Sequence, residues 1–326
     1  MSPASGSNPS RFRIPRWLRL TVGTLVVAAA LCFLVSRLIR DWSRIPFDDL
    51  EFNALCLAGS FLLLLVLHFP LYGHAWRLVL GTLGERIPLP SAVAVFASAQ
   101  LGKYIPGKVW FTLGRMSLAK REGVPEDRTL VSIFVETVFA LLSATVLFGI
   151  SILLVPRGTV PGPVYFVFAA VPLCLLLLYP PLLNRILGAV LRRLKRPVFR
   201  LEASYGRLLY ILLVYTLDWL VQGISCWLLI SSFYRLPFAH LPVLLGGYAI
   251  SWMLGFLTLI APAGLGIREG IFTFVLRLIV TEPIAIISAL VTRVWITLAE
   301  ALMALVSVLY LGVRRKNAQE AKNPQA

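Results

Sequence analysis

Charged residues are scarce in this sequence, and acidic ones are the scarcest. Only 14% of the 326 residues are charged, with 15 acidic residues against 31 basic ones, whereas soluble globular chains carry about 25% charged residues. Apolar residues make up 58% of the chain, and the mean hydropathy is +0.83. A single core in a chain of this size does not bury so much apolar surface. The composition therefore excludes an ordinary soluble domain and indicates a protein embedded in lipid.

The sequence also lacks the residue groupings of disulfide frameworks, metal centres and common catalytic sites. Its four cysteines form no C-x-x-C pair, and each lies in an apolar stretch: Cys32, Cys56, Cys174 and Cys226. The spacing of His68, His74 and His240 does not suit a metal-binding helix face, so we interpret them as interfacial residues. No G-x-S-x-G, H-E-x-x-H, P-loop or G-x-G-x-x-G motif occurs. We expect buried cysteines, no metal and no cofactor, and the sequence favours a non-enzyme without deciding the question.

Long apolar runs recur along the chain. The eight runs cover, within a few residues, Leu18–Leu38, Phe52–Leu80, Thr129–Val155, Val164–Leu183, Leu208–Phe233, Leu241–Ala261, Leu265–Val280 and Pro283–Leu311. All except the short seventh run reach the length of roughly 20 residues that crosses a bilayer. They lack the alternation of strands, and an open sheet edge has no hydrogen-bond partners in lipid. The sequence predicts an all-α membrane helix bundle with about eight crossings, formed by one domain at 18–312 between disordered tails at 1–17 and 313–326.

The basic residues indicate the orientation of this bundle. With the N-terminus on the cytoplasmic side, most of them fall on that side, above all in the Arg77–Arg128 stretch and the Arg185–Arg207 loop. Cytoplasmic loops of membrane proteins collect Lys and Arg, so an N-in/C-in topology is predicted. The same distribution explains the net charge of +16 without a nucleic-acid partner. Anionic lipid headgroups are the expected partners of these loops.

The Arg185–Arg207 loop carries apolar residues at helical spacing between its basic ones. This pattern suggests a short amphipathic helix on the inner membrane surface. A plain positively charged loop explains the pattern equally well, and both alternatives stay open.

Two segments differ from plain crossings. The segment near 91–116 is apolar and rich in small residues, and it is broken at Pro106 and Gly107 between Lys103 and Lys108. Because it is too short to span and must begin and end on the cytoplasmic side, it predicts a re-entrant pair of half-helices. The segment near 261–270 is broken in the same way by Pro262, Gly264 and Gly266, and Arg268 and Glu269 follow at once. Two interrupted segments, one in each half, point to a transport site, although tight turns between helices remain the alternative.

Several ionisable residues lie inside the predicted crossings. Glu136 belongs to the third run and Asp218 to the fifth, while Arg293, Thr297 and Glu300 share one helical face of the eighth. A charge at the bilayer centre costs at least ~2.5–3.5 kcal/mol, so these side chains should face the bundle interior and pair. We expect Arg293 to pair with Glu136 or Asp218. Such a pair either fixes helix packing or contributes to a cationic headgroup site.

Four features carry a resemblance to a known family: the Gly102–Gly107 element Gly-Lys-Tyr-Ile-Pro-Gly with Arg115, the Glu136 crossing, the Pro262–Gly270 element Pro-Ala-Gly-Leu-Gly-Ile-Arg-Glu-Gly, and the intramembrane Arg293. Together they resemble the transmembrane region of lysylphosphatidylglycerol synthases, a flippase-like domain, over about residues 20–312. The resemblance implies an inner-membrane bundle with re-entrant elements that moves a lipid or lipid-linked headgroup between leaflets. The soluble aminoacyl-transferring domain of the two-part synthases is not expected here, so synthase activity is not carried over.

The leading hypothesis is a flippase or transporter of an anionic phospholipid or lipid-linked headgroup. Its candidate substrate-binding residues are Lys103, Pro106, Gly107, Lys108, Arg115, Glu136, Asp218, Pro262, Gly264, Gly266, Arg268, Glu269, Arg293 and Glu300. Two alternatives stay open: a membrane partner of a cytoplasmic synthase or glycosyltransferase, and a membrane-embedded lipid-modifying enzyme. No catalytic residue is proposed for the last of these.

Overall fold

The structure is a computed structural model in which every regular element among the described residues is a helix. The described residues are 51–104, 109–156, 162–193, 197–257 and 266–320, together with Ser36, Ile39, Arg40, Lys195 and Gly264. Almost all of the first apolar run therefore lies outside them, as do Cys32, Pro106, Gly107, Lys108 and Pro262. The all-α fold class is confirmed for the part of the chain that is described.

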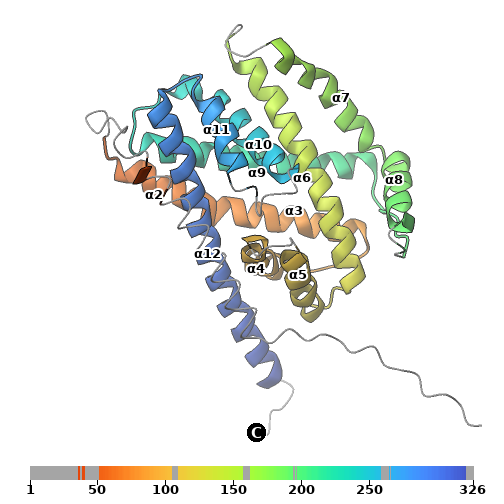
Figure 1. Ribbon diagram of the computed structural model, residues 1–326. Coiled ribbons are helices and arrows are strands. Elements are labelled where there is room, and N and C mark those ends of the chain that lie inside the picture. The colour runs from red at the N-terminus through yellow and green to blue at the C-terminus, as the bar shows by residue number, and fades with distance from the viewer. Residues whose placement is uncertain are drawn as a thin grey trace, which may run out of the picture.

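Among the described residues, five helical segments are long and apolar enough to cross a bilayer. They are Ala54–Thr82, which joins α2 (Ala54–Leu63), the π-helical turn η3 (Leu64–His68) and α3 (Phe69–Thr82); α6 (Glu126–Leu154); α9 (Tyr205–Ser231); Phe238–Leu257, which joins η6 (Phe238–His240) and α10 (Leu241–Leu257); and Glu282–Arg314, within α12 (Glu282–Glu320). Each coincides with a predicted apolar run. The helix α12 continues past the predicted domain boundary at 312 (Figure 1).

The fourth predicted run does not form one straight crossing. The 3-10 turn η5 (Gly162–Phe166) and α7 (Val167–Leu177) are bent by 84° from α8 (Pro180–Arg193), so the pair counts as a sixth span only if a broken span is allowed. Pro180 and Pro181 begin α8, separated by two residues from the end of α7, and a proline disfavours the helical conformation of the residue before it. A crossing formed by the fourth run therefore stays a prediction.

The seventh run is also too short to cross. It forms α11 (Ile267–Leu276), ten residues that rise only about 15 Å. Gly264 and Gly266, both with positive φ, precede α11, and α10 and α11 pack against each other, as expected for a broken segment. The described residues thus support five or six spans, and eight crossings and the N-in/C-in topology stay predictions.

The predicted re-entrant segment is a pair of short helices. It consists of α4 (Leu89–Gln100) with the 3-10 turn η4 (Leu101–Tyr104), followed after residues 105–108 by α5 (Val109–Arg121), and α4 packs against α5. Neither helix is long enough to span a bilayer. Two short helices were predicted here and are present, and their re-entry into the membrane stays a prediction.

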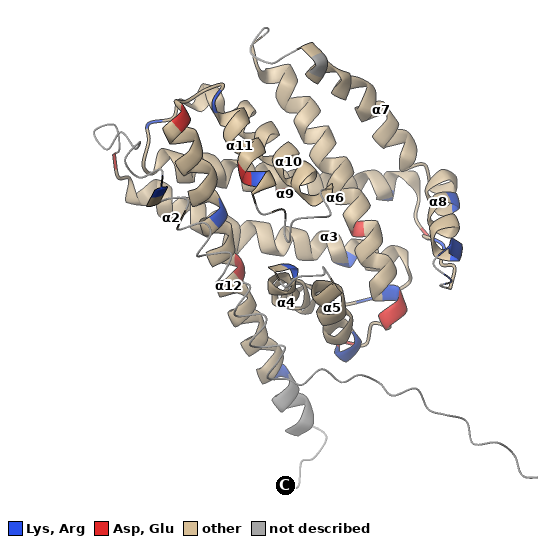
Figure 2. Ribbon diagram, in the orientation of Figure 1, with Lys and Arg blue, Asp and Glu red and all other residues tan. Residues whose placement is uncertain are grey.

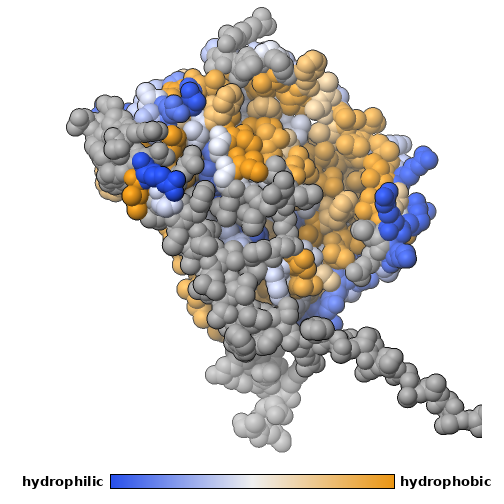
Figure 3. Space-filling view, viewed as in Figure 1, coloured by the Kyte–Doolittle hydropathy of each residue, from blue (hydrophilic) through white to orange (hydrophobic). Residues whose placement is uncertain are grey.

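Inside the bundle, α9 packs against α2, α3, α6 and α10, and α12 packs against α4 and α11. Figure 1 shows α2 and α8 at opposite ends of this arrangement and α12 along one side, with its C-terminal end projecting beyond the other helices. Apolar residues form a broad surface over the region of α6 and α7 (Figure 3). Figure 2 shows few charged positions on the ribbons, although some of both signs lie within the bundle on α6, α11 and α12. Those interior charges define the site described below.

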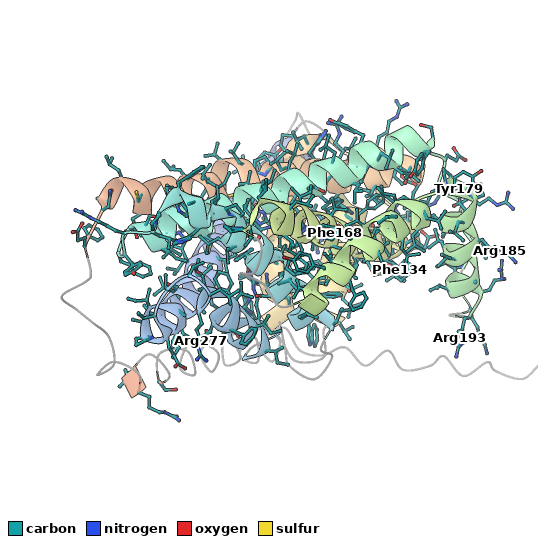
Figure 4. The ribbon with its side chains drawn as sticks, turned by 90° about the horizontal axis from the view of Figure 1, so that it is seen from above. Phe134, Phe168, Tyr179, Arg185, Arg193 and Arg277 are labelled. Carbon is teal, nitrogen blue, oxygen red and sulfur yellow. The ribbon has the colours of Figure 1, made fainter. Side chains whose placement is uncertain are left out.

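The helix α8 confirms the amphipathic helix predicted in the Arg185–Arg207 loop. Its apolar stripe, Leu183, Leu187 and Leu191, is buried in the same cluster as residues of α3, α6 and α9. Arg185 and Arg193 point away from the bundle (Figure 4). Packing against the bundle therefore buries the apolar stripe of α8, and its position on the inner membrane surface stays a prediction.

Candidate functional site

A cavity of about 310 Å³ lies where the two interrupted segments meet. The first segment contributes Lys103 from η4 and Thr112 from α5, and the second contributes Gly255, Gly264 and Arg268 from the end of α10 to the start of α11. Side chains of η3, α3, α4, α6, α9 and α12 complete the wall. The structure thus brings both interrupted segments to one site, as the transport hypothesis required.

Glycine backbone forms the second segment at the cavity. Gly264 has φ +69°, and a Cβ atom there would lie 2.9 Å from the carbonyl oxygen of Gly255. Gly266 has φ +84° and precedes the first residue of α11. Only glycine takes such a conformation routinely, so the glycines let the chain reverse tightly and place Arg268 at the wall.

The first segment is held to α12 by a network around Glu300. Lys103 and the Tyr104 hydroxyl both donate to the Glu300 carboxylate, the latter at 2.9 Å, and the Tyr104 hydroxyl also lies 3.0 Å from the Thr297 hydroxyl. Glu300 is 4% exposed. The expectation that Arg293, Thr297 and Glu300 share one face of the last helix is confirmed, because that face meets η4 and the cavity.

Arg293 pairs with neither of its predicted partners. Its Nε lies 3.4 Å from Oε1 of Glu269 on α11, and both side chains are nearly inaccessible to solvent. The other Glu269 oxygen accepts a hydrogen bond of 2.6 Å from the Gly266 N–H and so stabilises the helix start. The predicted pairing with Glu136 or Asp218 was wrong, because those carboxylates are held by side chains of other helices.

Glu136 is bound by Arg115 of α5. The two guanidinium NH groups donate to the two carboxylate oxygens at 2.8 and 2.5 Å, and the Tyr72 hydroxyl adds a bond of 3.1 Å. The Arg115 guanidinium lies 4.1 Å from the centre of the Trp76 ring and is completely buried. Arg115 therefore anchors α5 to α6, and it does not belong to the cavity lining.

Asp218 of α9 is bound by His68, a residue that the sequence had marked as interfacial. Its Oδ1 lies 2.7 Å from His68 Nδ1, and its Oδ2 accepts from Gln222 at 2.9 Å. His68 is 6% exposed and lines the cavity. The interfacial interpretation of His68 was therefore wrong, because the helix pair α3 and α9 buries the ring against a carboxylate that is distant in sequence. Gln222, one helical turn after Asp218, was the only local signal.

Arg268 differs from the other cavity cations. Its guanidinium lies 4.7 Å from the centre of the Tyr248 ring. Within the described part of the chain, no carboxylate forms an ion pair with it. Lys103 and Arg293 do have carboxylate partners, so among the described residues Arg268 is the lining Lys or Arg that we consider for binding an external anion.

Aromatic side chains form the rest of the wall. Trp219 and Trp252 contact each other edge to face at 4.9 Å, and Trp252 stacks on Phe256 at 5.3 Å. All three line the cavity. The site therefore combines a charged side with an aromatic one, which suits a molecule with both a polar head and an apolar part.

The predicted site residues fall into three groups. Those that line the cavity are Lys103, Glu136, Gly264, Arg268, Arg293 and Glu300. Those that hold a lining residue or the backbone beside it are Arg115, Asp218, Gly266 and Glu269. The remaining four, Pro106, Gly107, Lys108 and Pro262, lie outside the described residues.

A family model described as the lysylphosphatidylglycerol synthase TM region matches residues 17–313. The chain belongs to this family. It is a multi-pass integral membrane protein, as its spans indicate. None of the curated proteins matches this member of the family.

Proposed function

We propose that this protein is a flippase or transporter that moves an anionic phospholipid or lipid-linked headgroup across the inner (cytoplasmic) membrane. The observation that supports this most is Arg268 at the wall of a cavity formed by two interrupted helical segments. Irregular backbone at membrane depth is tolerated where it is buried in protein or lines a wet cavity. In transporters such breaks surround the substrate site.

The charges of the cavity favour an anion. Lys103 and Arg293 are matched by Glu300 and Glu269, and Glu136 is matched by Arg115. Arg268 adds a positive charge that no described carboxylate matches in an ion pair. A phosphate or carboxylate group would supply a negative charge to balance Arg268. The planar guanidinium of Arg presents its N–H donors in a fork that matches the oxygens of such groups. The aromatic wall beside it offers contacts to the apolar part of a lipid.

Lipid exchange between leaflets tests this function directly. The full chain is reconstituted into liposomes with fluorescent phosphatidylglycerol, phosphatidic acid, a polyprenyl phosphate or phosphatidylcholine, and a membrane-impermeant quencher reports the outer leaflet. We expect exchange of at least one anionic lipid above the rate of protein-free liposomes. Arg268→Ala removes a charge-assisted hydrogen bond of about 1.5–3 kcal/mol and should slow this exchange about tenfold or more.

The matched control is Arg277→Ala. Arg277 directly follows α11, and its half-exposed side chain lies 3.7 Å from Glu282, outside the cavity lining. This variant should exchange lipid at the rate of the unsubstituted protein. No exchange of any lipid, or equal rates for Arg268→Ala and the unsubstituted protein, would contradict the proposal.

The outward arginines of α8 favour a second candidate function, that of a membrane partner for a cytoplasmic synthase or glycosyltransferase. Arg185 and Arg193 extend from the bundle (Figure 4). This alternative predicts that such an enzyme co-purifies with the protein and is lost when both arginines are replaced by Gln. It also predicts an intact cellular phenotype for Arg268→Ala, which separates it from transport.

A further inference from the structure

The pair of His68 and Asp218 lies near the middle of two candidate spans, Ala54–Thr82 and Tyr205–Ser231. Their side chains are 7% and 2% exposed, and their nearest atoms are 2.7 Å apart. Ionisable residues at such a depth are costly, and in membrane proteins they mark ion and proton pathways. Binding of a headgroup by Arg268 does not use this pair.

Hydrogen bonding fixes which atom of His68 can take up a proton. An ionised carboxylate only accepts hydrogen bonds, so Asp218 holds the proton of the neutral ring on Nδ1, while Gln222 occupies its other oxygen. The remaining ring nitrogen, Nε2, is then the basic atom. His68 itself belongs to the cavity lining. A proton bound at Nε2 would add one positive charge to the cavity.

The backbone at His68 is unusual as well. Residues Leu64–His68 form the π-helical turn η3 inside an otherwise α-helical span, and the Phe69 N–H bonds to the Leu64 carbonyl. Single π-turns inside α-helices are rare and occur frequently at functional sites. The turn ends at His68 and so changes which side of the span the imidazole occupies.

Four helices, α2, α3, α9 and α12, pack against η3 and determine which charged groups surround His68. Asp218 lies on α9, and the Tyr72 ring lies on α3 with its centre 6.0 Å from the centre of the His68 ring. Arg293 and Glu300 lie on α12 and line the same cavity as His68. The helix α2 contains no Asp, Glu, Lys, Arg or His. Across the cavity lie Glu136, Lys103 and Arg268. Asp218 is the carboxylate in direct contact with the ring among the described residues, so it is the group that stabilises the imidazolium.

We propose that the His68–Asp218 pair is a proton-binding site whose proton is bound together with the anionic headgroup. This inference rests on the proposed transport function. The added charge on His68 favours an anion in the cavity, and by linkage the bound anion favours the proton to the same extent. Loaded cavities then carry one proton and one anion, so a pH difference moves the headgroup from the acidic leaflet toward the alkaline one.

Directed exchange is the first measurement. Liposomes containing fluorescent phosphatidylglycerol, or whichever anionic lipid exchanges in the assay above, receive a pH difference of one unit in either direction or a protonophore. We expect accumulation in the alkaline leaflet of up to about tenfold per pH unit for one proton per lipid. The direction should reverse with the gradient and vanish with the protonophore.

Variants separate the proton site from the headgroup site. In His68→Gln and Asp218→Asn, lipid exchange should lose its dependence on the gradient, whatever the rate of exchange in each variant. His74→Gln, on the same span but outside the cavity lining, should behave like the unsubstituted protein. Exchange by the unsubstituted protein that ignores the gradient would overturn the coupling and leave the transport function standing, whereas no exchange with any lipid would overturn both.

A second readout does not depend on transport or on the folding of a variant. The chain has three histidines, so ¹⁵N-histidine labelling gives three rings whose protonation can be followed by NMR in nanodiscs. His68 should change from the Nδ1–H neutral form to the imidazolium on acidification. A short-chain phosphatidylglycerol should move the pH midpoint upward by about one unit if the coupling is tenfold. A ring that stays in one form while the protein is folded, or a midpoint that ignores the lipid, would contradict the proposal.

Discussion

Arg115 and Glu136 form a bidentate ion pair that joins α5 to α6. The two N–O distances are 2.8 and 2.5 Å, and the Arg115 side chain is completely buried. A buried pair of this kind is costly to break, because the partner left behind is an uncompensated charge. Its presence explains how a short hairpin is held in a fixed position beside the cavity.

Removing one member of this pair should destabilise the protein strongly. We expect Arg115→Met to lower the free energy of unfolding by about 3–5 kcal/mol, because Glu136 would remain buried with only the Tyr72 hydroxyl as a hydrogen-bond donor. The double variant Arg115→Met/Glu136→Leu should recover much of this loss. Thermal unfolding in detergent micelles measures both effects.

The control for these two variants is the exposed ion pair of Lys120 and Glu126, whose side chains are 66% and 48% exposed. Lys120→Met should change stability by about 1 kcal/mol or less, because exposed ion pairs contribute little. If Arg115→Met were as stable to unfolding as Lys120→Met, the buried pair would not be what holds α5 to α6.

Gly102 should be required for the close approach of η4 to α5. A Cβ atom at this position would lie 2.7 Å from the Phe111 nitrogen and 2.9 Å from the Trp110 carbonyl carbon, both backbone atoms that cannot rotate away. Gly102→Ala should therefore cost about 1–3 kcal/mol and displace Lys103 from Glu300. Gly114→Ala is the matched control on α5, since nothing lies within 4 Å of its Cβ position; unfolding midpoints that fall equally for both variants would contradict the prediction.

Gly264 and Gly270 should respond to alanine with opposite signs. Gly264 has a positive φ, and its added Cβ atom would meet the Gly255 backbone, so Gly264→Ala should destabilise by at least about 1–2 kcal/mol. Gly270 is helical and open on all sides, so Gly270→Ala should stabilise α11 by about 0.5–1 kcal/mol. The comparison of the two unfolding midpoints tests whether the reversal before α11 depends on its left-handed residue. A neutral Gly264→Ala would show that it does not.

Much of the helical architecture could be read from the sequence, because apolar length is a local property. Five of the predicted runs coincide with spanning helices, and both Pro/Gly breaks fall between helices. Two further runs do not form straight spans of their own, and the reasons are also local. The dipeptide Pro180–Pro181 interrupts one, and the other is too short after the Gly266 turn.

The charge pairs could not be predicted in the same way. Arg293 and Asp218 lie deep within apolar runs of the sequence, which is why their burial was predicted correctly. Their partners, Glu269 and His68, belong to other helices whose rotation and depth depend on the packing of the whole bundle. Helical periodicity determines which residues share a face of one helix. It does not determine which face of another helix packs against that face.

The sequence by itself therefore determined that this chain is a helical membrane protein of a flippase-like family, with two interrupted segments and several buried charges. Hydrophobic length, proline and glycine act through neighbouring residues, which is why they can be read along the chain. Only the tertiary structure decided that described residues of both interrupted segments line one cavity, that Arg115 holds α5 to α6, and that a histidine and an aspartate meet at mid-span. Those contacts join residues far apart in sequence, and they form only when the packed helices bring them within hydrogen-bonding distance.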